Sequence, residues 1–252
     1  MRGKVCVGKK EHKSDLQKVI ALIPSAGLGR RIGYKTKKPF IKLDGRPILA
    51  HTIERLHAVK EIEEIIPILQ ETEMEYCLKE IVEKYGFTKI KRIAPGGKER
   101  QDSVYNGLKL LESHCEFVLI HDGVRPFITP ELIIECLKYA DREEGVVLGV
   151  PVRDTIKEAD SKGIIKGTIR REGLWFIQTP QVFRFHILMD AYERAFRDGY
   201  YGTDDASLVE RLGHRVKVIM GSPANIKITV KEDLLIGEAI LRSQGYKPYG
   251  SP

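Results

Sequence analysis

A short apolar run that opens into a basic, glycine-containing loop, Ile20–Arg31, limits the possible folds of this chain more than any other segment. Its apolar residues predict a buried strand of a parallel sheet, and ligands of such sheets bind beyond the carboxyl ends of the strands. Gly27 and Gly29 let backbone N–H groups approach a polyphosphate closely, while Arg31 and Lys38 add positive charge. The segment therefore predicts a phosphate site. The simpler alternative is an ordinary strand–loop–helix connection with solvated basic residues.

Spacing excludes two common glycine loops. Counted from Gly27, the Walker pattern needs a glycine and then a lysine where the chain has Ile32 and Gly33. The dinucleotide fingerprint fails at its third glycine, where the chain again has Ile32. A long basic loop that covers a triphosphate fits the segment better than a tight turn that holds a pyrophosphate.

Composition limits the classes of protein to which the chain can belong. Its 252 residues, 42% of them hydrophobic, suffice for one large α/β domain, and no apolar run approaches the roughly 20 residues of a membrane span. The formal charge of +7 suits nucleic acid or a small polyanion. Because no nucleic-acid-binding motif is present, we expect a small polyanionic substrate and neither nucleic acid nor a membrane as partner. The four cysteines form no Cys-x-x-Cys pair, so we expect no metal or disulfide framework, and the reducing cytoplasm is the default compartment.

Strand and helix patterns alternate along most of the chain. We predict strands at 19–24, 64–69, 89–94, 116–121, 145–151 and 215–220, and helices at 46–58, 73–85, 101–112, 130–140, 184–197 and 231–243. Thr129-Pro130 is typical of a helix start, and Thr229–Glu232 of a capping box before the last helix. The alternation indicates an α/β fold, with a mostly parallel twisted sheet and helices on both faces.

The segment of about 151–180 breaks this alternation. Two strand patterns, 152–156 and 164–169, flank a turn at 159–163 with no long helix between them, which predicts a β-hairpin arm that protrudes from the main sheet. Because an isolated two-stranded hairpin is only marginally stable, we expect the arm to pack on a second subunit. We include the arm in a single domain, 18–245, preceded by a basic N-terminal extension, 1–17, that need not be ordered.

A polar cluster, Gly96–Ser103, lies between a predicted strand and a predicted helix. Its paired glycines free the backbone to touch the edge of a planar base. Arg100, Asp102 and Ser103 can hydrogen-bond that edge or a ribose. The alternative is a helix start whose polar residues serve only as caps.

Another cluster, His121–Pro126, follows the predicted strand 116–121. A carboxylate at the carboxyl end of a strand is well placed for a ribose hydroxyl or a metal ion, so Asp122 is either a ligand or a capping group. Arg125 can reach a carboxylate or a phosphate. We expect His121 to be a buried structural histidine rather than a catalytic one.

Further polar residues lie at or near the ends of predicted strands, and any one of them could be structural. They are Arg153–Thr155, Arg171, Thr179–Gln181, Thr203–Asp205 and Asn225–Thr229. Together their cations and hydroxyls can hold a second phosphorylated molecule beside the first.

Taken in order, these motifs resemble one family over nearly the whole chain, from about 19 to 243. The matching segments are Pro24–Arg31, Gly96–Ser103, His121–Pro126, Pro151–Thr155, Gly173–Trp175, Thr179–Gln181 and Asn225–Thr229. The chain resembles the 2-C-methyl-D-erythritol 4-phosphate cytidylyltransferases of the non-mevalonate isoprenoid pathway. The resemblance implies a nucleotidyltransferase-like, Rossmann-like α/β domain with an arm that interlocks a homodimer. It also implies CTP as co-substrate and Mg²⁺ as cofactor.

The resemblance also implies roles for individual residues. The catalytic residues would be Arg31, Lys38 and Lys227. The nucleotide contacts would be Pro24, Ser25, Ala26, Gly27, Leu28, Gly29, Gly97, Lys98, Ser103, Asp122 and Gly123. The contacts with methylerythritol phosphate would be Arg125, Thr155, Arg171, Thr179, Thr203 and Lys227, those of Thr155 and Arg171 across the dimer. Asp122 would assist a Mg²⁺ ion that is held mainly by the CTP phosphates.

Two positions depart from the family pattern. Lys98 stands where the family commonly has Asp, so base recognition there would depend on backbone groups. Lys37–Phe40 replaces the usual Pro-Lys-Gln before an aromatic residue. The seven-residue step from Arg31 favours Lys38 as the catalytic lysine, and Lys37 remains the alternative.

Other functions remain as alternatives. A ribitol-5-phosphate cytidylyltransferase, or another sugar- or polyol-phosphate nucleotidyltransferase, would share the glycine loop and the His-Asp segment. A dehydrogenase would need the third glycine that the loop lacks. A nucleic-acid-binding protein would explain the basic charge but not the ordered set of motifs.

Overall fold

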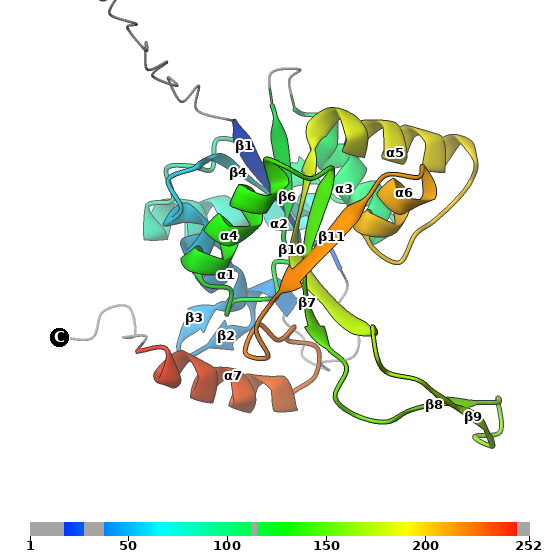
Figure 1. The fold of residues 1–252 in the computed structure, drawn as a ribbon. Coiled ribbons are helices and arrows are strands. Elements are labelled where there is room, and N and C mark those ends of the chain that lie inside the picture. Colours follow the sequence, from blue (N-terminus) through cyan, green and yellow to red (C-terminus); the bar gives the residue numbers. More distant parts are fainter. Residues whose placement is uncertain (1–17, 28–37, 112–114, 246–252) are drawn as a thin grey trace, which may run out of the picture.

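A seven-stranded sheet forms the centre of the protein (Figure 1). In the computed structural model, the described part of the chain comprises residues 18–27, 38–111 and 115–245. The strand order is β11-β7-β10-β6-β1-β4-β5, with β1 (Val19–Pro24), β4 (Ile62–Leu69), β5 (Ala94–Pro95), β6 (Phe117–Ile120), β7 (Gly145–Pro151), β10 (Trp175–Arg184) and β11 (Val216–Met220). β10 runs antiparallel to β6 and β7, and the other pairs are parallel. The predicted mostly parallel sheet is therefore confirmed.

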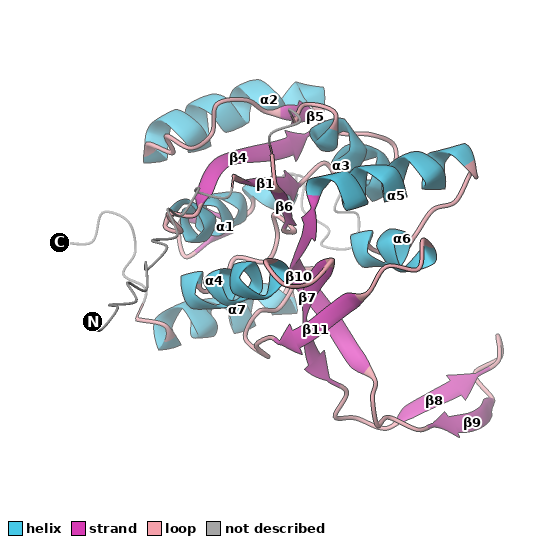
Figure 2. Cartoon of the chain, turned by 45° about the horizontal axis from the view of Figure 1, so that its top comes forward, coloured by secondary structure: helices cyan, strands magenta, loops and turns pink. Residues whose placement is uncertain are grey.

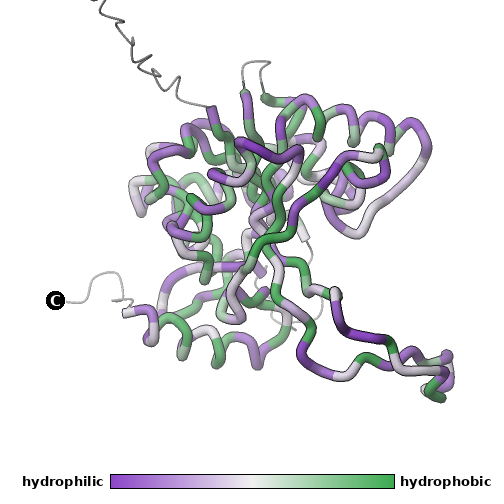
Figure 3. The backbone as a smooth tube through the Cα atoms, in the orientation of Figure 1, coloured by the Kyte–Doolittle hydropathy of each residue, from purple (hydrophilic) through white to green (hydrophobic). Residues whose placement is uncertain are grey.

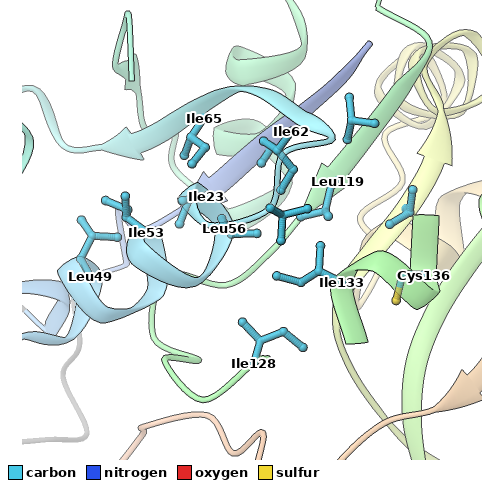
Figure 4. Packing of buried hydrophobic residues seen from close by; sticks show 14 of the residues in the cluster. Ile23, Leu49, Ile53, Leu56, Ile62, Ile65, Leu119, Ile128, Ile133 and Cys136 are labelled. Carbon is cyan, nitrogen blue, oxygen red and sulfur yellow. The ribbon is translucent and has the colours of Figure 1, made fainter. Parts of the chain in front are cut away.

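Helices cover both faces of this sheet (Figure 2). One layer holds α1 (Ile48–His57), α2 (Glu71–Cys77, continued by the π-helix η3, Leu78–Glu83) and α4 (Pro130–Ala140). The other holds α3 (Arg100–Leu108), α5 (Phe185–Arg197) and α6 (Asp205–Arg211). Successive residues of β1 serve opposite layers, because Ala21 and Ile23 pack in the first and Ile20 and Leu22 in the second. Figure 4 shows part of the first layer, where isoleucines of β1 and β4 meet leucines of α1.

A smaller hydrophobic cluster joins the C-terminal helix α7 (Glu232–Ser243) to the hairpin of β2 (Lys42–Leu43) and β3 (Arg46–Pro47). Leu43, Phe127 and Ile228 are buried at its centre. The backbone N–H of Ile228 also donates to the carbonyl of Val124 at 2.9 Å. The segment before α7 is thereby held beside the loop that follows β6.

The predicted last helix is confirmed, but its predicted capping box is wrong. Asp233, not Glu232, accepts the hydrogen bonds at the helix start, from the N–H and hydroxyl of Thr229 and from the N–H of Val230. Burial would raise the pKa of Asp233, but these hydrogen bonds and the positive charge of Lys38 lower it. The start of α7 therefore lies within electrostatic reach of Lys38.

Other local predictions have mixed outcomes. Thr129 caps α4 as predicted, with its hydroxyl accepting the N–H of Leu132 at 3.4 Å. The strand predicted at 89–94 is wrong, since only Ala94–Pro95 pairs with β4. β10 and α6 have no counterpart among the predicted elements.

The hairpin arm is formed by β8 (Ile156–Ala159) and β9 (Ile165–Ile169), which make a two-stranded sheet of their own. It extends from the ends of β7 and β10, away from the main sheet (Figure 1). The first predicted arm strand, 152–156, is wrong, because pairing begins only at Ile156. Green, hydrophobic colour reaches the tip of the arm in Figure 3, where Ile164 and Ile165 are 64% and 60% exposed. Among the described residues, no helix combines the length and apolar character needed to cross a bilayer.

Candidate active site

A cavity of about 440 Å³ opens where β1 and β6 end. Its walls come from the residues after β1, the 3-10 helix η2 (Lys38–Phe40), the start of α3, the residues after β6 and the segment before α7. The lining residues are Pro24, Ser25, Ala26, Gly27, Lys38, Pro39, Gly97, Lys98, Glu99, Arg100, Ser103, Asp122, Val124, Lys227 and Thr229. Ten of the residues named in the sequence analysis as nucleotide-binding or catalytic thus lie around one cavity: Pro24, Ser25, Ala26, Gly27, Lys38, Gly97, Lys98, Ser103, Asp122 and Lys227.

The loops that form the cavity approach one another closely. A Cβ atom at Gly123 would lie 2.0 Å from Oγ of Ser25, and one at Gly96 would lie 2.3 Å from Cβ of Ala26. The amide of Gln70 also donates to the carbonyl of Ala26 at 2.9 Å. A side chain at Gly96 or Gly123 would therefore force Ser25, Ala26 or the surrounding backbone to shift.

The segment Gly97–Ser103 is a capped helix start, and several of its residues line the cavity. The predicted helix cap is therefore confirmed, and the contact with a base stays a prediction. The N–H of Gly97 donates to the hydroxyl of Ser103 at 2.9 Å, and that hydroxyl donates to the carbonyl of Glu99 at 3.0 Å. The N–H of Glu99 donates to the carboxylate of Asp102 at 2.8 Å. This network fixes the backbone that the sequence analysis assigned to the base.

Asp122 lies at the centre of a cluster of cations. Its Oδ2 lies 2.7 Å from Nζ of Lys227 and 3.7 Å from Nε of Arg125, and its Oδ1 lies 3.3 Å from Nε of Arg100. Burial would raise the pKa of Asp122, but the charges of Arg100, Lys227 and Arg125 more than offset it and hold the pKa well below its usual range. Asp122 is therefore ionised at neutral pH.

Arg100 joins this cluster to a second buried carboxylate. Its Nη1 and Nη2 donate to Asp205 at 3.0 and 2.7 Å, and Asp205 is completely buried. Arg100 was predicted to hydrogen-bond a base edge or a ribose and Asp205 was noted only within a polar segment, so their pairing was not predicted. Two such distant positions give no local signal that they meet.

His121 has both ring nitrogens engaged. Because the carbonyl of Arg125 can only accept, the ring must donate to it from Nε2, at 2.9 Å. Nδ1 then accepts from the hydroxyl of Thr179 at 3.0 Å, and that hydroxyl accepts the N–H of Asp122, also at 3.0 Å. Burial lowers the pKa of His121 to about 4, so the ring is neutral at pH 7. The expected burial of His121 is confirmed, and its structural role stays a prediction.

The remaining predicted contacts do not line the cavity. Thr179 is buried beside His121. Arg125 donates from Nη1 to the carbonyl of Asn225 at 2.8 Å. Thr155, Arg171 and Thr203 are exposed, and Arg171 donates to the carbonyl of Arg153 within the arm. Leu28, Gly29, Arg31 and the alternative lysine, Lys37, lie outside the described residues.

The described residues of the cavity could supply part of the ligand set of a metal ion. Within residues 18–27, 38–111 and 115–245, no group of three or more His, Cys, Asp and Glu side chains could hold one. Asp122 is an ionised carboxylate on the cavity wall, and Mg²⁺ is commonly bound by one or two carboxylates together with substrate phosphates. Asp122 can therefore supply one protein ligand, with the other ligands coming from a nucleotide.

Comparison with known proteins identifies the family. Residues 19–243 match the sequence profile of 2-C-methyl-D-erythritol 4-phosphate cytidylyltransferase. Relatives of that name from Geotalea uraniireducens and Clostridioides difficile are 47% and 49% identical over 90% and 88% of this chain, and over 97% and 93% of their own length.

Solved structures agree. A 4-diphosphocytidyl-2C-methyl-D-erythritol synthase from Anaerococcus prevotii superposes with a TM-score of 0.79 at 35% identity, covering 90% of this chain and 97% of that one. A 2-C-methyl-D-erythritol 4-phosphate cytidylyltransferase from Thermus thermophilus superposes with a TM-score of 0.75 at 30% identity, covering 89% and 99%. The chain belongs to the 2-C-methyl-D-erythritol 4-phosphate cytidylyltransferase family.

Proposed function

We propose that the chain transfers the cytidylyl group of CTP to 2-C-methyl-D-erythritol 4-phosphate, giving 4-diphosphocytidyl-2-C-methyl-D-erythritol and pyrophosphate. Membership of the family makes this the expected reaction. One structural observation carries the proposal for the site. Lys38 and Lys227 line the same cavity as the capped segment Gly97–Ser103, so cations for phosphates and backbone groups for a base are adjacent.

The nucleophile is a phosphate oxygen of the acceptor, which attacks the α-phosphorus of CTP in line with the departing pyrophosphate. The second pKa of a phosphomonoester is about 6, so the nucleophile is mostly dianionic at neutral pH and needs no general base. The arrangement at His121 supports this, because both of its ring nitrogens are occupied by Thr179 and the carbonyl of Arg125.

The main obstacle is the repulsion between two polyanions, which fixed cations reduce. In our proposal Lys38 and Arg31 hold the triphosphate and stabilise the charge that develops in the transition state. Lys227 lines the cavity and pairs with Asp122. Its remaining N–H groups would donate to the incoming phosphate. Asp122 contacts the ribose or the metal ion.

Mg²⁺ is the proposed cofactor, with Asp122 as its protein ligand and the CTP phosphates as its other ligands. A bound Mg²⁺ would supply charge neutralisation at the phosphate oxygens. Asp122 stays ionised for this role because Arg100, Arg125 and Lys227 surround it.

The arm is the proposed dimer contact. Ile164 and Ile165 of the hairpin and Phe176 near the start of β10 are 64%, 60% and 55% exposed, which is unfavourable for apolar side chains that face water. Packing on a partner would bury these residues and carry Thr155 and Arg171 towards the partner's cavity, where the family's arm residues bind the acceptor. We propose the cytoplasm as the compartment, since Cys77, Cys115 and Cys136 are free and buried.

A pyrophosphate-release assay that crosses four nucleoside triphosphates with two acceptors tests the function. We expect release with CTP and methylerythritol 4-phosphate and little with ribitol 5-phosphate. Efficient release with ribitol 5-phosphate would instead favour the alternative polyol-phosphate nucleotidyltransferase. Release without any acceptor would contradict a transferase.

A further inference from the structure

Asp205 begins α6 and is completely buried, yet the proposed reaction gives it no role. Both of its oxygens accept hydrogen bonds from the guanidinium fork of Arg100, at 3.0 and 2.7 Å, and Oδ1 also accepts from the hydroxyl of Tyr192. A buried carboxylate is costly unless it is paired and fully hydrogen-bonded. The position of Asp205 therefore depends on Arg100.

Arg100 extends this contact to the cavity. Its Nε, the remaining side of the same planar group, donates to Oδ1 of Asp122 at 3.3 Å. A guanidinium holds its donors in a rigid plane, so an Arg100 whose fork is fixed by Asp205 presents Nε to Asp122 from one direction. Three elements, α6, α3 and the end of β6, are thereby connected through one side chain.

A second residue of α3 binds the segment that leads into α6. Gln101 donates to the carbonyl of Tyr200 at 3.0 Å and accepts the N–H of Gly202 at 2.9 Å. The connection from α5 to α6 is thus bound to the first turn of α3. These hydrogen bonds fix the start of α6, and with it Asp205, relative to Arg100.

The opposite oxygen of Asp122 faces the other two cations. Lys227 lies 2.7 Å and Arg125 3.7 Å from Oδ2. Without a partner at Oδ1, the carboxylate is free to rotate towards Lys227 and Arg125, which would draw it from its place in the cavity wall. Arg100 is the contact that opposes this rotation.

We infer that Asp205 is a positioning residue, which acts through the fork of Arg100 to fix the carboxylate of Asp122 at the wall of the nucleotide cavity. The inference rests on the proposed function, in which Asp122 contacts the ribose or metal ion of CTP. It adds to that function a requirement for a residue that never touches the substrate.

The test is Asp205→Asn, which keeps the shape of the side chain and removes its charge. We expect the KM for CTP to rise about tenfold and kcat to fall by about 10- to 100-fold, since a misplacement of about 1 Å can cost about 100-fold. Calorimetric titration with CTP distinguishes a loss of the fold from weaker binding of CTP. The stoichiometry should stay at that of the wild type, which reports an intact fold, while the Kd rises.

Tyr192→Phe is the matched control, because it removes a hydrogen bond from Asp205 but leaves the Arg100 fork in place. It should lower the melting temperature as Asp205→Asn does, and leave KM, kcat and Kd within about twofold of the wild type. Arg100→Lys keeps the positive charge but loses the two-pronged contact with Asp205. It should therefore show the same changes in KM, kcat and Kd as Asp205→Asn.

The outcomes distinguish a failure of the proposed function from a failure of the proposed role of Asp205. A wild-type protein that is inactive with CTP and methylerythritol phosphate contradicts the proposed function, whatever the variants do. An active wild type with an Asp205→Asn variant of unchanged KM, kcat and Kd overturns the inference alone. Equal kinetic losses in Tyr192→Phe would also overturn it, because they would assign the effect to stability. If Asp205→Asn does not fold, Arg100→Lys decides, and its wild-type kinetics would overturn the inference.

Discussion

The ammonium group of Lys227 lies 2.7 Å from Oδ2 of Asp122, on the wall of the cavity that Lys38 also lines. The pair joins the segment before α7 to the end of β6. A lysine held by a single carboxylate oxygen keeps two further donors for a ligand. Lys227 is thus oriented towards the cavity before any phosphate arrives.

Removal of this ammonium should slow the reaction without unfolding the protein. We predict that Lys227→Ala lowers kcat/KM by about 100-fold or more, as the loss of one electrostatic donor typically does. The protein should stay folded because Asp122 keeps its contacts with Arg100 and Arg125. Steady-state kinetics with thermal melting measure the two effects. Lys217→Ala is the control, since Lys217 pairs with Glu143 on the surface at 3.0 Å. Equal losses in the two variants would contradict a specific role.

Lys38→Ala should lower kcat by about 100- to 1,000-fold, because Lys38 supplies positive charge where the triphosphate is expected. Lys42→Ala, in the exposed part of β2, removes the same charge a few residues away and should change kcat little. The comparison is made at saturating CTP and acceptor. A Lys38→Ala variant with nearly normal turnover would transfer the catalytic role to Lys37.

Arg171→Ala should raise the KM for methylerythritol 4-phosphate and leave the KM for CTP nearly unchanged, since its proposed partner is the acceptor phosphate. The neighbouring Arg170, 86% exposed in its side chain and paired with Glu172, gives the control Arg170→Ala. An unaltered KM for the acceptor would remove Arg171 from the substrate site.

Mixed dimers test whether the arm serves the partner's cavity. When Arg171→Ala and Lys227→Ala chains are unfolded together and refolded, a crossing arm leaves one intact site in each heterodimer. The mixture should then recover roughly a quarter of wild-type activity, as expected for random pairing in a twofold dimer. No recovery above the two separate variants would mean that each arm serves its own chain.

Stability should fall on mild acidification because of two buried histidines. Burial lowers the pKa of both His51 and His121 to about 4, so below the ordinary value of about 6.5 the unfolded state binds more protons than the folded state. The free energy of unfolding should decrease from about pH 6.5 towards pH 4, by up to about 1.4 kcal/mol per pH unit for each histidine. Urea titrations at pH 7.5 and pH 5 measure this. Most carboxylates titrate below pH 5. An unchanged free energy of unfolding at pH 5 would therefore contradict neutral, buried histidine rings.

The sequence predicted the parts of the fold that depend on local pattern. β1, β7 and α4 follow from continuous apolar runs and a Thr-Pro helix start, and these signals need no knowledge of distant residues. β10 was missed because Pro180 lies within it, and proline normally argues against a central strand. A register shift between Gln178 and Gln181 accommodates the proline, and tertiary packing then overrides the local preference.

The candidate site divides in the same way. Gly97 and Asp122 could be found because they follow strands, where ligands of such sheets bind. The pairing of Arg100 with Asp205 could not, because it depends on how the folded chain brings the first residues of α3 and α6 together. Thr179 illustrates the reverse, since a polar residue near the end of a strand proved to be buried against His121.

The crystal structure of the wild-type enzyme with CTP and no acceptor would test the central claim most directly. We predict that the triphosphate lies between Lys38 and Lys227, with the cytosine against Gly97–Ser103. A nucleotide bound away from this cavity, with both lysines unengaged, would contradict the claim that these cations bring the two phosphates together.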